Sequence, residues 1–204
     1  PLDRTEQRDV TWPRRLLRSL PNVLTKYFRY IHDTPPDWPD KDWRGVRAME
    51  NAVTGYWLYR QTGKPWILEA IESIRKNCFD WATYYEKFPW DSAAFAEKRI
   101  PTETWTGLTA HGVNNGMAIK YPGLWYQQSG DERFKNAVSA GLKKYDLNHG
   151  QAGGRFSCDE HLAGKSPDHG TELCTVVEEM FSLEELYEIF GDNSLADRLE
   201  LLTF

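Results

Sequence analysis

The sequence predicts an all-α fold built from helix hairpins. Residues 59–63, 126–130 and 187–191 share a Tyr-x-x-x-Gly pattern. Each glycine follows one helical pattern and precedes another, which is typical of a left-handed residue that ends a helix before a tight turn. Apolar residues recur at spacings of three and four on both sides of the turns. We therefore expect three helix hairpins.

The first hairpin is preceded by a further helical segment. Pro13 and Pro21 each lie where a helix would start, so residues 16–31 are expected to form one kinked helix or two short ones. Three prolines, Pro35, Pro36 and Pro39, then end this segment. In the hairpin itself, one apolar stripe runs over residues 46–57 and a second over residues 67–85.

The other two hairpins follow the same pattern. The middle one opens near residues 106–109 and carries Pro122, whose missing N–H is expected to kink or shorten its helix. The last has an apolar stripe over residues 173–190 that continues to Leu202. Two long irregular stretches remain, residues 88–106 and 148–170, and loops of this length in a compact domain are usually functional.

The repeat length indicates how the hairpins assemble. The three glycines are 67 and 61 residues apart, and a period near 60 with long loops is typical of an (α/α)6 barrel, or toroid. Six such hairpins would need about 360 residues. We therefore expect residues 1–204 to be a partial (α/α)6 catalytic domain of a larger protein, with no second domain in the chain.

Composition excludes several classes of function. With 30 acidic and 25 basic residues the net charge is −5, which argues against a nucleic-acid surface. No apolar stretch approaches the roughly 18–20 residues of a membrane span. Three scattered cysteines do not form a disulfide framework and favour a reducing compartment or a metal site. Because the N-terminus has the character of a truncation, both a cytoplasmic and a secreted location stay open, and the oligomeric state is not indicated.

The densest reactive cluster lies in the second long loop and the helix after it. It holds Glu160, Glu172 and Cys174. With Thr171 as the N-cap, Cys174 takes the third helical position, where the helix dipole favours a thiolate, the form that binds zinc. Either glutamate has the chemistry of a general acid, a base or a metal ligand.

A purely structural interpretation of this cluster stays open. Cys174 would then be a small buried hydrophobe, and Glu172 a first-turn acid favoured by the helix dipole. Residues two apart on a regular helix point to opposite sides, so these two share a site only at a frayed first turn. Cys78 fits a core position, and Cys158 has no assigned role.

A second candidate site is a helix that is amide-rich on one side. His111, Asn114 and Asn115 lie opposite an apolar face and suit hydrogen bonding to the hydroxyls of a carbohydrate. The alternative is a merely solvated face, although Gly112 and Gly116 indicate close packing or ligand approach. The nine tryptophans allow for a sugar-stacking platform, with most of them in the core.

Four segments together resemble a known enzyme family. They are TAHGV (109–113), DEHLAG (159–164), GTELC (170–174) and E-x-M-x-S (178–182). They are similar to the β-L-arabinofuranosidases of glycoside hydrolase family 127. The resemblance covers most of the chain and implies an (α/α)6 barrel followed by β-rich domains. It also implies hydrolysis of plant-type, arabinose-containing glycans with retention of configuration, by a zinc-bound cysteine thiolate.

The resemblance also assigns roles to residues. Glu172 and Cys174 match a pair of zinc ligands, and Glu172 is also expected to be catalytic. Glu160 matches the acid/base carboxylate, and His111 matches a substrate-contacting histidine. The family's nucleophile and remaining zinc ligand are cysteines further downstream, which neither Cys78 nor Cys158 matches. The nucleophile is therefore expected outside this fragment.

Two other classes of function stay open. One is a zinc-dependent, thiol-activating α/α toroid enzyme, which uses Cys and His ligands on the same architecture. The other is a non-catalytic, glycan-binding helical scaffold. Metal content and turnover distinguish these alternatives from a glycosidase.

Overall fold

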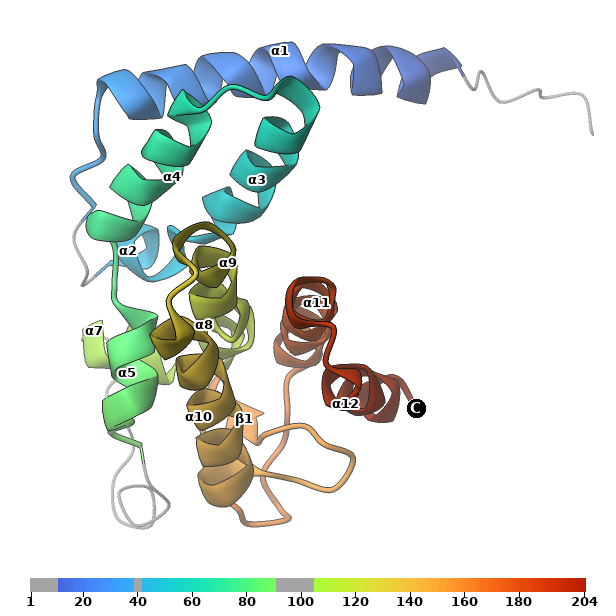
Figure 1. The fold of residues 1–204 in the computed structure, drawn as a ribbon. Helices are drawn as coiled ribbons and strands as arrows, with labels where there is room; N and C mark the ends of the chain where they lie inside the picture. The colour runs from blue at the N-terminus through green and yellow to red at the C-terminus, as the bar shows by residue number, and fades with distance from the viewer. Residues whose placement is uncertain (1–10, 39–41, 91–104) are drawn as a thin grey trace, which may run out of the picture.

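A computed structural model describes residues 11–38, 42–90 and 105–204 of the protein. These residues are mostly helical, which confirms the all-α class (Figure 1). Their one β-ladder joins two strands of two residues each, β1 (Cys158–Asp159) and β2 (His161–Leu162). No helix in this described part is both long and apolar enough to cross a membrane.

The N-terminal segment is one helix, α1 (Thr11–Asp33), and it contains Pro21 in its interior. Of the two arrangements expected for this segment, the structure therefore has the single helix. A short helix, α2 (Trp43–Arg47), follows. Its N-cap is Asp42, whose carboxylate accepts hydrogen bonds from the backbone N–H groups of Arg44 and Gly45, which otherwise lack partners at a helix start.

The three predicted turns are confirmed. Helix α3 (Glu50–Thr62) is joined to α4 (Trp66–Lys76), α9 (Lys120–Ser129) to α10 (Glu132–His149), and α11 (Leu173–Phe190) to α12 (Asn193–Thr203). Gly63, Gly130 and Gly191 end the first helix of each pair with φ of 64°, 65° and 63°. Each glycine N–H donates to the carbonyl of the tyrosine four residues earlier. Since this backbone region is disfavoured for residues with a Cβ, glycine fits the position.

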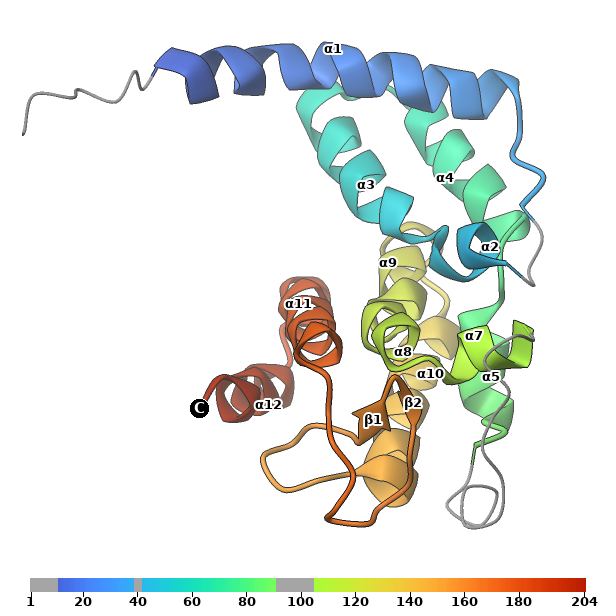
Figure 2. The ribbon, with the colours of Figure 1, turned by 180° about the vertical axis from the view of Figure 1, so that it is seen from behind.

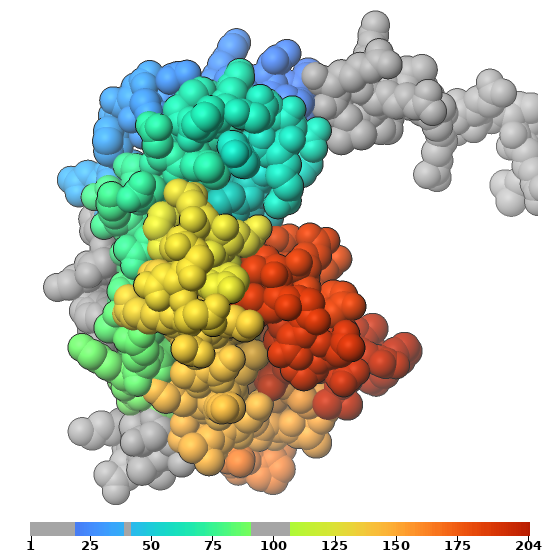
Figure 3. Space-filling view, in the orientation of Figure 1, coloured from blue at the N-terminus to red at the C-terminus, as the bar shows by residue number. Residues whose placement is uncertain are grey.

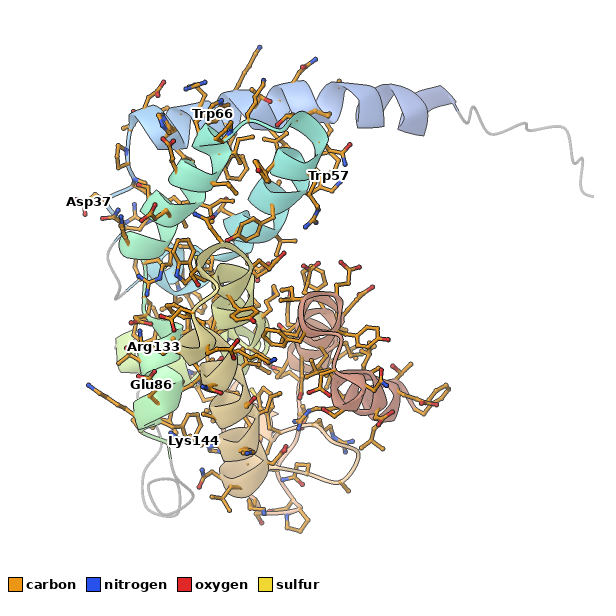
Figure 4. All side chains as sticks on the ribbon, in the orientation of Figure 1. Asp37, Trp57, Trp66, Glu86, Arg133 and Lys144 are labelled. Carbon is orange, nitrogen blue, oxygen red and sulfur yellow. The ribbon has the colours of Figure 1, made fainter. Side chains whose placement is uncertain are left out.

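The apolar stripe after the first turn is not one helix. Helix α4 ends at Lys76, and α5 (Trp81–Lys87) starts anew with Asp80 as its N-cap. Helix α5 then packs on α10, far along the chain. Arg133 of α10 donates to Glu86 at 2.7 Å, and Lys144 donates to the carbonyls of Tyr85 and Glu86 (Figure 4).

The middle hairpin begins with three short helices, α7 (Trp105–Ala110), α8 (Gly112–Ala118) and α9. His111 separates the first two with an extended backbone, φ −63° and ψ 126°. Pro122 is the third residue of α9, where a missing N–H costs no intrahelical hydrogen bond. The expected shortening is confirmed, since a new helix begins two residues before the proline.

The helices are arranged as an open arc. Figures 1 and 2 show α1, α3 and α4 at one end, α11 and α12 at the other, and α5 and α8 to α10 between them. Helix α11 packs on α8, α9 and α12. In the space-filling view the surface is notched between α3 and α11 (Figure 3). One main core runs through the arc, with Phe28, Ile71, Tyr85, Tyr145 and Leu186 all fully buried.

Candidate functional site

Glu160 lies at the tip of the β1–β2 hairpin with its side chain exposed. Its φ of 68° makes it the one non-glycine residue with a positive φ in the described part of the chain. Such a conformation is costly for a residue with a Cβ and is concentrated at functional sites. The backbone N–H of Gly112, the first residue of α8, donates to the Glu160 carbonyl at 2.8 Å and holds the tip in place.

The hairpin also fixes the segment that carries Glu172. The N–H of Cys158 donates to the Gly170 carbonyl at 2.9 Å, and the N–H of Glu172 donates to the Cys158 carbonyl at 3.2 Å. The Asp159 carboxylate accepts the N–H of Gly170 at 2.9 Å. Glu160 and Glu172 are therefore positioned by one connected backbone network, as their proximity in the sequence suggested.

Glu172 and Cys174 lie together at the start of α11. The Cys174 Sγ is 3.6 Å from the Glu172 Oε2, and Cys174 is exposed. Glu172 and Cys174 therefore lie together at the first turn of the helix, as predicted. The alternative of a buried, hydrophobe-like Cys174 is wrong, because its side chain is exposed.

Two details of the helix start differ from expectation. The N-cap is Glu172 rather than Thr171, whose hydroxyl instead donates to the carbonyl of Phe156, so Cys174 is the second helical residue. The expected lowering of the Cys174 pKa is also wrong for the chain alone. Partial burial raises the pKa of this thiol because it disfavours the charged thiolate. The Glu172 carboxylate raises this pKa as well, because it repels a second negative charge.

Two histidines flank Glu160. The backbones of His111 and His161 pair in an antiparallel bridge, and their rings lie 5.6 Å apart at 82°. Burial, then His161 and Arg47, lower the pKa of His111 to about 4, and burial lowers the pKa of His161. Both rings are therefore neutral at pH 7. The Nδ1 of His111 is buried and has no hydrogen-bond partner within the described residues.

Asn114 and Asn115 are fully buried, so the exposed amide face expected from the sequence is not present. The Asn115 amide donates to the carbonyls of Thr109 and His111, and its oxygen accepts from the Tyr145 hydroxyl at 2.6 Å. Asn114 donates to a carbonyl of α7 and accepts from Arg47. Both amides bind groups of the fold itself, and their role toward a substrate stays a prediction.

The other two cysteines are separate from the exposed pair. Cys158 is fully buried, and burial raises its pKa to about 12. Its Sγ accepts from the Thr175 hydroxyl at 3.6 Å. Cys78 is half-buried two residues after the end of α4, and its thiol donates to the Arg75 carbonyl. Neither has the exposure of a thiol nucleophile.

Sequence reasoning missed the contacts of two cations, Arg47 and Lys120. Arg47 of α2 donates from Nε to the Asn114 Oδ1 at 2.7 Å. Lys120 of α9 is fully buried, 2.5 Å from Glu50 and 3.9 Å from Glu178. These partners are 58 to 70 residues away in the sequence, and no local pattern signals such contacts.

The described residues supply only part of a zinc site. Glu172 and Cys174 are two ligands of suitable type, whereas protein-bound zinc takes three or four from the protein. No group of three or more His, Cys, Asp or Glu side chains in the described ranges is placed to hold a metal ion.

Comparisons with protein-family models, curated proteins and solved structures found no match to this chain.

Proposed function

We propose that this chain is the helical part of a retaining glycoside hydrolase of the β-L-arabinofuranosidase type, acting on arabinose-containing glycans. The observation that carries the proposal is the placement of Glu160. Its exposed carboxyl stands on a left-handed backbone held by Gly112, between two histidines that burial keeps neutral. An exposed carboxyl group on a fixed backbone, near neutral hydrogen-bonding rings, suits proton transfer to and from a sugar.

Glu160 acts first as the acid and then as the base. It gives its proton to the glycosidic oxygen as the bond from that oxygen to the anomeric carbon breaks and the nucleophile bonds to the same carbon. It then takes a proton from the water that displaces the nucleophile, so the configuration is retained. The resemblance supplies the nucleophile, a cysteine thiolate downstream of the residues described. The neutral rings of His111 and His161 are placed to hydrogen-bond the sugar hydroxyls near this carboxyl.

Zinc would be held by Glu172 and Cys174 together with ligands from outside the described residues. When bound, it keeps a coordinating thiol deprotonated. The proximity of Sγ and Oε2 at the first turn of α11 supports this pair as two neighbouring ligands. Without the metal the same carboxylate raises the pKa of the Cys174 thiol.

The proposal includes an (α/α)6 barrel as the architecture. The three equivalent glycine turns and the arc formed by the hairpins support it, since successive hairpins turn about one side of the molecule (Figures 1 and 2). In this arrangement α3, α8 and α11 form part of the inner wall of the barrel. The β1–β2 hairpin, which carries Glu160, then lies at one end of that wall.

Replacement of the acid tests the function. In a protein that includes the proposed downstream nucleophile, Glu160→Gln should lower hydrolysis of 4-nitrophenyl β-L-arabinofuranoside about 100-fold or more, because it removes proton transfer. Glu200→Gln, an exposed position on α12, is the control and should leave the rate unchanged. Activity of Glu160→Gln within about tenfold of wild type would contradict the role. Binding of the glycoside by the wild type without turnover would instead identify a glycan-binding scaffold.

A further inference from the structure

Trp43 differs from the other tryptophans of the described part of the chain. Its side chain is 46% exposed, whereas the others with described side chains are buried or half-buried. Single exposed hydrophobic residues are common and need no explanation by themselves. What distinguishes this indole is how it is held and what lies beside it.

The Trp43 ring is fixed by two neighbours. The guanidinium carbon of Arg47 lies 4.5 Å from the centre of the indole, and the ring of His111 meets it at 5.2 Å and 86°. Arg47 is in turn held by the buried Asn114, whose amide donates to the Leu108 carbonyl at 2.7 Å. Polar contacts anchored on the buried Asn114 thus order a side chain that remains almost half exposed.

The same contacts place the Trp43 indole near the β1–β2 hairpin, which carries Glu160. His111, which touches Trp43, pairs through its backbone with His161, the residue after Glu160. The Gly112 N–H that anchors the Glu160 carbonyl belongs to the next residue along. Trp43 and the Glu160 tip therefore both contact the start of α8, Trp43 through the His111 ring and Glu160 through the Gly112 N–H.

We propose that Trp43 is a stacking platform for the sugar ring of a glycan whose glycosidic bond reaches Glu160. This assignment rests on the proposed function, which requires the glycosidic bond of the substrate to point toward Glu160. A flat ring offers apolar area to the C–H face of a sugar at a low cost in side-chain entropy, and a ring ordered in advance loses little on binding. The ordering by Arg47 and His111 provides that preorganisation.

The chain contains a matched control. Trp66 of α4 is also covered by an arginine, Arg29 at 3.9 Å, and also meets a histidine edge-on, His32 at 6.0 Å. It is half-buried where α4 meets α1, at the end of the arc opposite α12 (Figure 4). The two clusters have the same three residue types, and they differ in exposure and in the presence of Glu160.

The experiment measures binding separately from hydrolysis. Methyl β-L-arabinofuranoside is titrated calorimetrically into the protein that includes the proposed downstream nucleophile and carries Glu160→Gln, alone and combined with Trp43→Ala, Trp43→Phe or Trp66→Ala. We expect Trp43→Ala to raise the Kd about tenfold, Trp43→Phe to raise it less, and Trp66→Ala to leave it unchanged. Circular dichroism of each variant verifies the fold, and Trp43→Phe retains a ring if the alanine variant unfolds.

The outcomes separate the two proposals. Binding that depends on Trp43, together with no hydrolysis by a wild-type protein that includes the proposed downstream nucleophile, supports the platform and overturns the glycosidase function. An unchanged Kd in Trp43→Ala overturns the platform, as does an equal loss in Trp66→Ala. Absence of binding to every variant, including the Glu160→Gln parent, overturns it too, whatever rate the wild type has on aryl glycosides.

Discussion

Arg198 donates through both Nε and Nη2 to a single oxygen of Glu179, at 3.1 and 2.9 Å, while the other carboxylate oxygen is buried without a donor among the described residues. The Nη1 of the same guanidinium reaches both oxygens of Asp146 at 2.8 and 2.9 Å. Helices α10, α11 and α12 thus meet at one arginine. Glu179 is 1% exposed, and burial raises its pKa to about 7 against the lowering effect of Arg198.

This carboxyl should make stability depend on pH. Because its pKa rises from 4.5 in the unfolded chain to about 7 on folding, the folded state binds the extra proton between these values. The free energy of unfolding should therefore fall by on the order of 3 kcal/mol as the pH rises through this window. Glu179→Gln, which stays neutral, should lose that dependence. Urea denaturation at several pH values measures it.

Glu184→Gln is the control for this measurement, since Glu184 is exposed on the same helix. It should keep the wild-type slope of stability against pH. If Glu179→Gln kept the same slope as well, the burial of the Glu179 carboxyl would not be the cause of the dependence of stability on pH.

Lys120 should hold three helices together. Its ammonium is fully buried between Glu50 of α3 and Glu178 of α11, and it also donates to the Met117 carbonyl at 3.1 Å. Lys120→Met would leave two partly buried carboxylates facing each other without a cation. We expect a loss of about 3 kcal/mol in unfolding free energy, measured by urea denaturation.

An exposed pair supplies the comparison for Lys120. Lys76 and Glu72 form an ion pair at 2.6 Å on the surface of α4, with side chains 63% and 41% exposed. Lys76→Met should cost less than about 0.5 kcal/mol, because water solvates and screens both charges. Equal losses in the two lysine variants would show that burial does not distinguish them.

The sequence predicted the features that depend on neighbouring residues. A glycine that ends a helix is recognisable because its left-handed backbone and its hydrogen bond to the tyrosine four residues earlier are local, and all three turns follow this pattern. The proximity of Glu172 and Cys174 was predictable for the same reason. The break of the long apolar stripe at Asp80 was not predicted, although Asp80 caps α5.

Contacts between distant segments were not predictable from the pattern. Asn114 was expected to face a ligand, yet its partner is Arg47, 67 residues earlier. The helical period gives the face of a side chain but not which neighbour covers that face. Lys120 gave no signal for the same reason, since a lysine in an ordinary helical pattern is usually exposed.

Gly112 should be required for the position of the Glu160 hairpin. A Cβ at Gly112 would lie 1.7 Å from the Cys158 Sγ and 2.8 Å from the Thr175 hydroxyl. Gly112→Ala should lower the unfolding free energy by about 2 kcal/mol or more, because both neighbours are packed against it. It should also lower hydrolysis, since the N–H that holds Glu160 would move.

A double variant identifies the cause of the Gly112 effect. Cys158→Ala removes the nearest atom, so Gly112→Ala should cost less in this background than in wild type, with a coupling of about 1 kcal/mol. Strict additivity of the two substitutions would mean that the thiol is not what the added methyl group meets.

Cys174 provides the most direct test of the metal. Its exposed thiol, next to the Glu172 carboxylate, should be the first of the three cysteines to react with a thiol reagent in metal-free protein, since Cys158 is buried with a pKa of about 12. Zinc should protect it from the reagent. Cys174→Ser should lower the zinc bound per chain, measured by atomic emission, and Cys78→Ser should not, because the Cys78 thiol donates to the Arg75 backbone carbonyl of α4. Equal zinc content in wild type and Cys174→Ser would rule the thiol out as a ligand, and labelling of Cys174 that zinc leaves unchanged would do the same without reference to activity.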